Sequence, residues 1–535
     1  MVNNTMKNFT TTGVCIQSEN YMVNINDQIV KIKAMVDKGQ YFTINRARQY
    51  GKTTTLNILG QTLQSDYYVV SLDFQGIGDA SYKTEEKFVK AFCRQLKRKA
   101  MKVRMPDYTL NKITGIIERR EGLATLDELF DILVEWCDIS EKPIVMIIDE
   151  VDSATNNQVF LDFLAQLRLM YLEQKKDSSY KAFKSVILAG VTDVKNLKRK
   201  LRPEDAHKFN SPWNIAADFN IDMSLSAEGI SGMLDDYEND HHVGMNTVQL
   251  AQEIHDYTGG YPFLVSRICQ IIDIELIGGN LYEPAAAWTS FGITEAVKRI
   301  LLEKNTLFDS LMGKVYDNAP LKDVLQRILF GGERIPYNPD NIPAMDGEMY
   351  GFVKNDNGAL AVANRIFETR LYNYFLSLSE MEDIPISRYG SNNREQFIEN
   401  GRLNMEKLLE HYVTVFDDIY EGKAETFSEE EGRRRFLLYI RPIINGTGNY
   451  YIETETRNKE RMDLVIDYLG ERHIVELKIW RGSAYHEKGE IQLANYADHY
   501  HLDRAYLLSY SFNKNKKTGL THKIVQGKTL IEAFV

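Results

Sequence analysis

The sequence is poor in cysteine and proline, with 4 Cys and 12 Pro in 535 residues. Cys15, Cys93, Cys137 and Cys269 form no CxxC pair, which indicates reduced thiols in a cytoplasmic protein and argues against a zinc site. No apolar run approaches the length of about 18 residues that a membrane-spanning helix needs. The opening residues lack the basic and apolar regions of a signal peptide. We therefore expect a cytoplasmic protein without a membrane partner.

The composition is that of an ordinary globular chain, with 44% hydrophobic and 26% charged residues. The length predicts about three to four domains. A net charge of −11 argues against a general polyanion binder, but the charge is uneven. Residues 426–535 carry 17 Lys and Arg against 15 Asp and Glu, whereas the rest carries 47 against 60. The last fifth of the chain is therefore the part least repellent to phosphate.

Short apolar runs alternate with amphipathic segments between residues 41 and 225. The predicted strands are 41–44, 67–74, 143–149, 185–191 and 219–225. The predicted helices are 53–63, 85–102, 126–136 and 160–173. This alternation predicts an α/β fold with a parallel sheet that helices cover on both faces.

The remaining chain predicts four further segments. Residues 226–290 form a helical lid, and 291–383 form helices, a hairpin around Asn355-Asp356-Asn357-Gly358 and a helix, which suggests a winged-helix-like module. Residues 384–425 are a connecting helical segment, and 426–535 begin a new strand-rich α/β unit. With the core over 1–225, this makes five predicted segments.

A phosphate-binding loop is predicted between the first strand and the first helix. Arg46-Ala47-Arg48-Gln49-Tyr50-Gly51-Lys52-Thr53-Thr54 follows the strand and runs into an amphipathic helix, as in a P-loop. Gly51 lets the backbone approach phosphate, Lys52 would reach the β- and γ-phosphates of ATP, and Thr53 would ligate Mg²⁺. We assign nucleotide binding to Arg48, Gln49, Tyr50, Gly51, Lys52, Thr53 and Thr54. The alternative is a surface lysine at a helix start, and the usual first glycine is replaced by Arg46.

A second motif, residues 143–150, ends an apolar strand with two carboxylates. Ligands of open α/β sheets bind at the carboxyl ends of the strands, so Asp149 is placed to hold Mg²⁺ and Glu150 to activate water. The alternative is a solvated strand end. A further strand candidate, 67–74, falls between the two motifs, which fits the P-loop branch whose catalytic glutamate follows the strand-end aspartate.

These motifs resemble the bacterial AAA-ATPase-like family, which is similar to the STAND class of P-loop switch ATPases. The resemblance rests on INRARQYGKTT, IVMIIDEVD, SVILAGVTDVKNL, SPWNIAADFNID and TGGYPFLVSRIC, and covers residues 10 to 380. That family also lacks the first glycine. The resemblance implies that Thr192 senses the γ-phosphate and that Gly260 and Pro262 line the nucleotide. The alternatives are a strand-terminating hydroxyl and an interhelical turn. The sequence shows no clear arginine finger, with Arg267 as a candidate, and this suggests slow turnover or help from a neighbouring subunit in a homo-oligomer.

A hairpin over residues 461–478 predicts a second site. A turn at Leu469-Gly470 places Asp463 opposite Glu476, with Cβ atoms about 5 Å apart, and Lys478 on the same face. Opposed carboxylates repel, and a divalent cation such as Mg²⁺ relieves this and activates water. The apolar face holds Leu464, Ile466, Val475 and Leu477. The alternative is an exposed hairpin on which Glu476 and Lys478 form a surface ion pair.

Gln492 and Tyr496 follow at i and i+4 of the next helix and share one face. With Asp463, Glu476 and Lys478 they resemble the RecB-type branch of the PD-(D/E)xK nuclease superfamily, although the leading proline is missing. The resemblance covers residues 426–535 and implies a restriction-endonuclease-like fold, a metal ligand on the preceding helix, for which we choose Glu430, and a nucleic-acid substrate, DNA before RNA. The alternative for Glu430 is a solvated helix start. The basic runs 433–435 and 514–517 are solvated faces or contacts to a nucleic-acid backbone.

The sequence thus predicts a P-loop ATPase switch fused to a Mg²⁺-dependent nuclease, with defence or control of mobile DNA as the expected setting. Two alternatives stay open. In the first, the C-terminal domain binds nucleic acid without cutting it. In the second, the protein is a signalling scaffold that binds nucleotide tightly and releases it rarely.

Overall fold

The chain is divided into two compact units in a computed structural model. The structure describes residues 7–119, 124–192, 194, 211–331, 333–381, 385–392, 394–420, 426–444, 447–451, 464–480, 482–500, 502–513 and 516–535. Unit 1 comprises Met1–Ala251, Gly260–Gln270 and Met349–Gly351. Unit 2 comprises Gln252–Gly259, Ile271–Glu348 and Phe352–Val535. This division is coarser than the five predicted segments, whose boundaries stay predictions.

Unit 1 is built on a parallel sheet of four strands, which confirms the predicted α/β fold of this part. The strands are β1 (Phe42–Asn45), β2 (Tyr68–Asp73), β3 (Ile144–Asp149) and β4 (Ser185–Gly190), in the order β1-β4-β3-β2. Strand β4 therefore lies between the strands of the two phosphate motifs, and β2 lies beyond β3. The apolar runs of β3 and β4 are buried throughout, as expected for strands covered on both faces.

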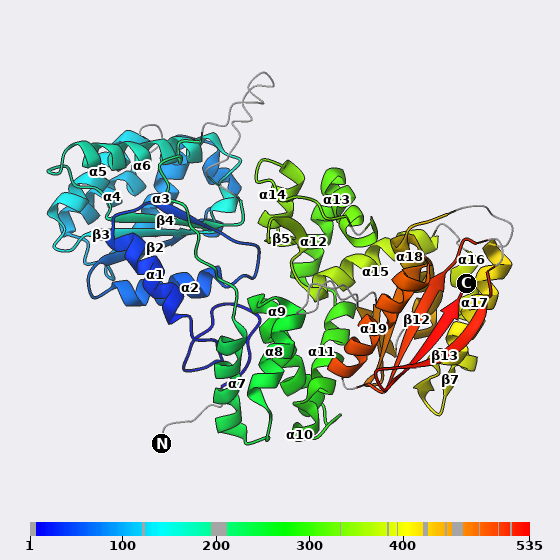
Figure 1. The fold of residues 1–535 in the computed structure, drawn as a ribbon. Helices are drawn as coiled ribbons and strands as arrows, with labels where there is room; N and C mark the ends of the chain where they lie inside the picture. Colours follow the sequence, from blue (N-terminus) through cyan, green and yellow to red (C-terminus); the bar gives the residue numbers. More distant parts are fainter. Residues whose placement is uncertain are drawn as a thin grey trace. The chain divides into compact units, whose positions relative to one another are not determined.

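Helices cover both faces of this sheet (Figure 1). On one face α1 (Asn26–Asp37) and α2 (Lys52–Leu63) pack against alternate strand residues such as Ile147 and Ile187. On the other face the core includes residues of α3 (Glu85–Lys99), α4 (Asp107–Glu118), α5 (Leu126–Ile139) and α6 (Gln158–Lys176). Alternation along each strand thus supplies two separate cores.

Unit 1 differs from the sequence prediction in one strand and in two helices. No strand forms over residues 219–225, and the isolated β-bridge between Ala217 and Phe42 lies just before this segment. Asp222 instead accepts hydrogen bonds from Ser224, so a local turn replaces the ladder. Helices α1 and α4 were not predicted, although Leu110, Ile113, Ile116 and Ile117 of α4 follow helical spacing and pack into the core.

The segment predicted as a helical lid is helical. It contains α7 (Ala227–His241), α8 (Thr247–Thr258), α9 (Pro262–Gln270) and a π-helix (Ile271–Ile277). Of these, α7 and α9 belong to unit 1.

Unit 2 begins with helices and a hairpin. The helices are α10 (Pro284–Ala287), α11 (Ser290–Leu302), α12 (Thr306–Asp317), α13 (Ala319–Gly331), α14 (Ile342–Met349) and α15 (Arg365–Met381). Strands β5 (Val353–Asp356) and β6 (Ala359–Val362) pair antiparallel around Asn357 and Gly358, whose φ values of 48° and 84° suit a tight hairpin turn. The predicted hairpin and following helix are confirmed, and the winged-helix assignment stays a prediction.

A mixed sheet of six strands dominates the rest of unit 2. Its strands are β9 (Gly448–Tyr451), β10 (Leu464–Tyr468), β11 (Glu471–Ile479), β12 (Arg504–Tyr510), β13 (Gly519–Val525) and β14 (Lys528–Phe534), in the order β13-β14-β12-β11-β10-β9. Strands β11, β12 and β14 run parallel, and the outer pairings are antiparallel.

Helices also cover both faces of this second sheet. Helix α19 (Ser483–His499) packs Leu493 against Ala505 and Leu507 of β12. On the opposite face, Tyr510 of β12 bonds to Tyr412 of α17 (Met405–Tyr420) and to the Gly432 carbonyl of α18 (Glu429–Ile444). The segment predicted as a connector, which also holds α16 (Pro385–Asn392) and the short pair β7 (Ile398–Glu399) and β8 (Arg402–Leu403), thus contributes α17 to this core.

No helix in the described ranges is both long enough and apolar enough to cross a lipid bilayer.

Candidate functional site

The loop between β1 and α2 has the backbone of a phosphate cradle. Gly51 caps α2 with φ 77°, a conformation that favours glycine, and the helix begins at Lys52. Gln49 also has a positive φ of 56°. The first N–H groups of α2 therefore emerge beside the loop, where they and the helix dipole favour an anion. The predicted strand, loop and helix are thus in place.

Lys52 is held inside this loop by backbone oxygens. Its Nζ donates to the carbonyl oxygens of Arg46 at 2.9 Å and Ala47 at 3.0 Å, and the side chain is buried. Burial lowers the pKa of Lys52, while the negative charges of Glu150 and Asp152 act to raise it. A buried ammonium bound by neutral carbonyls excludes the alternative of an ordinary surface lysine, and these carbonyls are acceptors that a phosphate would replace.

A hydrogen bond joins the two phosphate motifs. The Thr53 hydroxyl donates to Asp149 Oδ2 at 2.8 Å, and Thr53 itself is exposed. These are the two side chains predicted to hold Mg²⁺, and a hydroxyl and a carboxylate are oxygen ligands of the kind that this ion takes. The residues therefore fit a Mg²⁺ ion with water and phosphate as further ligands, and their role stays a prediction.

Glu150 leaves the strand in a bent conformation. Its φ of 54° and ψ of 42° are left-handed, and its N–H donates to Asp149 Oδ1 at 2.9 Å. Burial raises the pKa of the Glu150 carboxyl, and the nearby Lys52 charge acts in the opposite direction. Bent backbone and perturbed acidity are common at functional sites, so the solvated strand end is the weaker interpretation.

Asp152 is a site residue that the sequence analysis missed. Its carboxylate oxygens accept the N–H groups of Val191 and Thr192, each at 2.7 Å, and thus fix the end of β4. Gly190 permits this contact, since a Cβ there would lie 2.9 Å from Val151 Cγ2. Thr192 is thereby held at the same edge of the sheet as Asp149. The sequence signal that could have identified Asp152 was its place as the third acid in Asp149-Glu150-Val151-Asp152.

The Gly260-Tyr261-Pro262 turn contacts the phosphate loop. The Tyr261 hydroxyl donates to the Arg48 carbonyl, and Pro262 Cγ lies 3.8 Å from the position that a Cβ on Gly51 would take. Gly260 has φ 70°, and a Cβ there would lie 2.2 Å from the Leu225 oxygen, so only glycine fits. The turn thus lies beside the loop, and the role of Gly260 and Pro262 in lining the nucleotide stays a prediction.

The other loop residues have different surroundings. Arg46 turns its guanidinium to the Asn45 and Ile221 carbonyls, both at 2.7 Å, and its φ is not positive, so this position does not require glycine. Tyr50 packs edge-on against Tyr261 with ring centroids 4.8 Å apart. Thr54 accepts the Cys15 N–H at 3.2 Å, which turns its hydroxyl toward the N-terminal segment. Arg48 is exposed at the loop surface.

Arg267, the candidate arginine finger, bonds within its own helix. Its Nη1 donates to Gln270 Oε1 at 2.8 Å. This contact gives no support to a role for Arg267 at the phosphates of its own subunit.

The second candidate site lies in unit 2 on β10 and β11. Leu464 pairs with Val475 and Ile466 with His473, which confirms the predicted register and turn. Asp463 lies outside the described residues, so its predicted position opposite Glu476 is untested. Glu476 is fully buried and its Oε1 lies 2.8 Å from Lys478 Nζ. The alternative of an exposed surface ion pair is therefore wrong.

Helix α19 places its predicted residues over the same face of the sheet. Gln492 Nε2 donates to the Tyr496 hydroxyl at 2.7 Å. A Cβ on Gly489 would lie 3.4 Å from Lys478 Cε, so the helix backbone passes close to that lysine. Helix α19 thus carries the predicted Gln492 and Tyr496 and covers the predicted Lys478.

The acidic start of α18 lies beside the end of β11. Glu429 Oε1 accepts the Ile479 N–H at 3.1 Å, one residue after Lys478. The side chain of Glu430, our predicted ligand, lies outside the described residues. Glu431 instead pairs with Arg434 and Arg435 at 3.3 and 3.0 Å. Glu429 is therefore the described acid of this run that contacts the strand carrying Glu476 and Lys478.

The arginine run on α18 is largely occupied by the protein itself. Arg435 also lies 4.3 Å from the ring centroids of Tyr420 and Phe427, and Arg433 is buried. Contacts of this run with a nucleic-acid backbone would need these interactions to break, so that interpretation is disfavoured.

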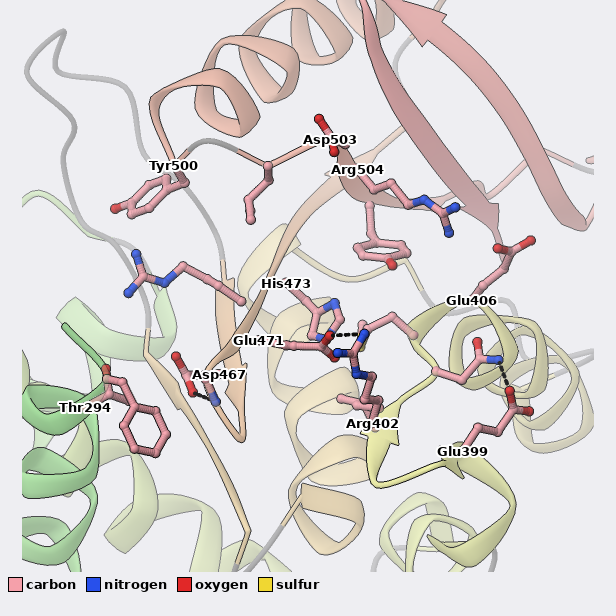
Figure 2. Close-up of a pocket in the computed structure, with 18 of the residues that line it drawn as sticks. Thr294, Glu399, Arg402, Glu406, Asp467, Glu471, His473, Tyr500, Asp503 and Arg504 are labelled. Carbon is pink, nitrogen blue, oxygen red and sulfur yellow. Dashed lines mark hydrogen bonds and ion pairs between the residues drawn. The ribbon is translucent and has the colours of Figure 1, made fainter. Parts of the chain in front are cut away.

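A cavity of ≈ 980 Å³ opens at the other end of β11 and β12. Figure 2 shows Arg402 turned toward Glu471, and their ion pair is 3.1 Å long. His473 in this cavity has its pKa lowered to about 4 by burial. Arg472, at this end, and Lys478 are six residues apart on one strand, which corresponds to about 20 Å. The cavity is therefore separate from the predicted catalytic centre.

Comparison with known proteins places the phosphate loop in a family. A family model described as an AAA-like domain matches residues 9–278. An uncharacterized WD repeat-containing protein of Synechocystis sp. is 23% identical over 359 residues, which are 63% of this chain and 28% of that protein. The chain thus spans about a quarter of the length of this relative.

Similar solved structures include the Walker-type ATPase of Pyrococcus abyssi, which is 12% identical, has a TM-score of 0.45, and covers 68% of this chain and 99% of its own. Cdc6p of Pyrobaculum aerophilum is 14% identical and has a TM-score of 0.35. The match covers 68% of this chain and 96% of Cdc6p. The RuvB Holliday junction branch migration motor of Thermotoga maritima is 13% identical and has a TM-score of 0.31. The match covers 64% of this chain and 92% of RuvB.

Proposed function

The chain belongs to the family of proteins with an AAA-like domain, whose model matches residues 9–278, and on this premise we propose that unit 1 is a Mg²⁺-dependent ATPase switch. The observation that carries the proposal is the hydrogen bond between Thr53 and Asp149, because it unites the two motifs that ATP hydrolysis requires. Lys52 would bind the β- and γ-phosphates, and Glu150 would orient and deprotonate the attacking water.

The surrounding residues support a switch rather than a bare hydrolase. Asp152 fixes the Thr192 backbone at the edge where the γ-phosphate would lie. Tyr261 ties the turn before α9 to the loop through the Arg48 carbonyl. A change at the phosphates therefore has a direct route to helix α9, and we expect a neighbouring subunit of a homo-oligomer to supply the arginine finger.

The test is ATP binding and hydrolysis by the full-length protein with Mg²⁺. Lys52→Ala removes the ammonium, so we expect hydrolysis to fall by about 10²–10³-fold, comparable to the loss of one transition-state donor. Lys87→Ala, on an exposed face of α3, is the matched control and should hydrolyse ATP like the wild type. Equal activity of Lys52→Ala and Lys87→Ala would refute the proposal for unit 1.

For unit 2 we propose a Mg²⁺-dependent nuclease of the restriction-endonuclease-like fold, acting on DNA before RNA. The support is the strand arrangement, in which an antiparallel β9-β10-β11 meander continues into parallel β12 between helices α18 and α19. Buried Glu476 with Lys478 lies on this meander, beside Glu429 and under α19. A fully buried carboxylate in contact with a partly buried lysine is costly to desolvate, which favours a functional reason for placing the pair there.

The residues fit a magnesium centre in their chemistry. Asp463 and Glu476 would supply carboxylate oxygens, and Lys478 would orient water or stabilise the phosphoryl oxygens. When bound, Mg²⁺ would acidify a water ligand and neutralise charge on the phosphate. The alternative is a domain that binds nucleic acid without cutting it. Such a domain needs no bound Mg²⁺ and no activated water.

The nuclease and the non-cutting alternative are distinguished by incubating labelled single- and double-stranded DNA and RNA with the protein and Mg²⁺. Lys478→Met should reduce cleavage by about 10²-fold or more, while Lys488→Met, exposed on α19, should leave it unchanged. Cleavage that persists in Lys478→Met refutes the catalytic assignment. Binding without cleavage by the wild type supports the non-cutting alternative.

A further inference from the structure

A second cluster of ligand-type side chains lies between α19 and β14. His486 and Glu490 are one turn apart on α19 and share a face, and Glu532 is on β14. The three are 7%, 5% and 7% exposed, and one ligand atom from each lies within 4.8 Å of the others. Burial of a histidine and two carboxylates at this spacing requires a compensating charge.

The imidazole nitrogen gives an independent indication of a bound cation. His486 Nε2 lies 2.6 Å from Glu532 Oε1 and 3.6 Å from Glu490 Oε1. This buried nitrogen nevertheless forms no hydrogen bond of acceptable geometry. A nitrogen and an oxygen at 2.6 Å without an aligned proton repel each other, and a cation between the ligands removes this repulsion.

The neighbours of the cluster support its ligands. Ser509 donates to Glu532 Oε1 at 2.8 Å and so orients that carboxylate. The ring centroids of Trp480 and His486 are 4.6 Å apart, so the indole shields the imidazole from water. Lys523 pairs with Glu490 Oε2 from the solvent side, since its own side chain is 54% exposed. Lys523 thus supplies one positive charge at the edge of the cluster, against two carboxylates.

We propose that His486, Glu490 and Glu532 bind a divalent transition-metal ion, Zn²⁺ or Mn²⁺. An imidazole with carboxylates suits such ions, whereas Mg²⁺ prefers oxygen ligands alone. The lack of CxxC pairs does not bear on this site, because no cysteine takes part.

This site is distinct from the proposed magnesium centre. Glu476, Leu507 and Glu532 are neighbours across β11, β12 and β14, so the two glutamates are two strand spacings apart, about 10 Å. Paired catalytic ions lie about 4 Å apart. The ion therefore has a structural role, because it fastens the start of α19 to β14 and thereby positions Gln492 and Tyr496.

The test uses the full-length protein after chelator treatment, without nucleotide and with excess Mg²⁺ to occupy the other centres. Calorimetric titration with Zn²⁺ and, separately, Mn²⁺ should show one high-affinity equivalent. His486→Gln and Glu532→Gln should each weaken the affinity by more than about tenfold, since even outer residues of metal sites have effects of that order. Glu476→Gln should keep the equivalent, because it belongs to the other centre.

His522→Gln is the matched control. His522 lies on adjacent β13 and also contacts a glutamate, Glu406, at 2.7 Å, but its side chain is 53% exposed. This variant should bind the ion like the wild type. Absence of a bound equivalent in the wild type, or undiminished affinity in His486→Gln, would overturn the proposal and leave a buried histidine–glutamate ion pair.

A spectroscopic measurement covers the case in which the variants fail to fold. Wild-type protein loaded with Co²⁺ should show the intense visible bands of a four- or five-coordinate site, and Mn²⁺ should lose its free-ion electron paramagnetic resonance signal in proportion to the protein added. Co²⁺ bands of an octahedral aquo ion, or an unchanged Mn²⁺ signal, would refute the site without any mutation.

Discussion

The two candidate centres each contain a lysine beside carboxylates, but the lysines are bound differently. Lys52 donates to two backbone carbonyls of its own loop, whereas Lys478 pairs with the fully buried Glu476 carboxylate. An incoming phosphate replaces neutral acceptors at Lys52 at little cost. A metal ion that takes Glu476 must first separate it from Lys478. Backbone thus pre-forms the first centre, and side-chain rearrangement completes the second.

Glu150→Gln tests the first half of this comparison most severely. If the nucleotide centre is pre-formed, the change should lower ATP turnover by about 10²–10⁴-fold, the usual contribution of a general base, while ATP affinity stays near the wild-type value. The measurement is turnover rate together with nucleotide Kd. Glu228→Gln, on an exposed face of α7, is the control. A loss of affinity equal to the loss of rate would contradict the assignment.

The same residue gives a pH prediction. Burial raises the pKa of Glu150 above its ordinary 4.5, so the basic carboxylate is lost at a higher pH than in a free glutamate. The acid limb of the ATPase profile should therefore lie above pH 4.5 in the wild type. A partly buried charge with a raised pKa also lowers stability at neutral pH, so Glu150→Gln should be at least as stable as the wild type.

Gly260→Ala asks whether the turn beside the loop is fixed by backbone geometry. The new methyl group would meet the Leu225 oxygen at a positive φ, so we expect the free energy of unfolding of unit 1 to fall by about 3 kcal/mol or more. Gly232→Ala is the control, because a Cβ there has open space within helix α7 and should stabilise the protein by about 0.5–1 kcal/mol. Denaturant unfolding measures both, and equal stability of the two variants would show that the turn is adaptable.

His473 provides a test confined to unit 2. Burial lowers its pKa to about 4, whereas the unfolded chain takes up the proton near 6.5. Stability is therefore lost as the pH falls from 6.5 through 4, by up to about 3 kcal/mol. His473→Gln should remove this part of the acid sensitivity, and His522→Gln, at an exposed position, should not. Parallel pH curves for the wild type and His473→Gln would contradict the prediction.

Tyr261→Phe sharpens the comparison with the smallest change. The variant loses the hydrogen bond to the Arg48 carbonyl but keeps the ring packed against Tyr50, so the unfolding free energy should fall by about 1 kcal/mol. Thermal unfolding with and without ATP measures the effect. A larger loss with ATP than without it would show that the turn responds to the bound nucleotide.

Local pattern explains what the sequence predicted correctly. A strand, a Gly-Lys-Thr loop and a helix lie within one short segment, so their geometry follows from near neighbours. The hairpin register followed from alternation around Leu469 and Gly470. Strand 219–225 failed for the opposite reason, because Asp222 offers its own turn to the backbone and overrides the apolar pattern.

Sequence patterns could not predict contacts between residues that are far apart in the chain. The role of Asp152 depends on β4 lying beside β3, and the contact of His486 with Glu532 depends on α19 lying over β14. The sequence shows the pair His486 and Glu490 at helical spacing, but not the strand that completes the cluster. Asp463 stays a prediction, since it lies outside the described residues.

The bonds from Lys52 to the Arg46 and Ala47 carbonyls have a thermodynamic consequence for the loop. A loop braced by its own lysine does not have to become ordered when a triphosphate arrives, so its entropic contribution to association should be small. The signal that distinguishes one nucleotide from another must then originate in the parts that touch the loop from outside. The tyrosine preceding Pro262 is the first residue in the path of that signal.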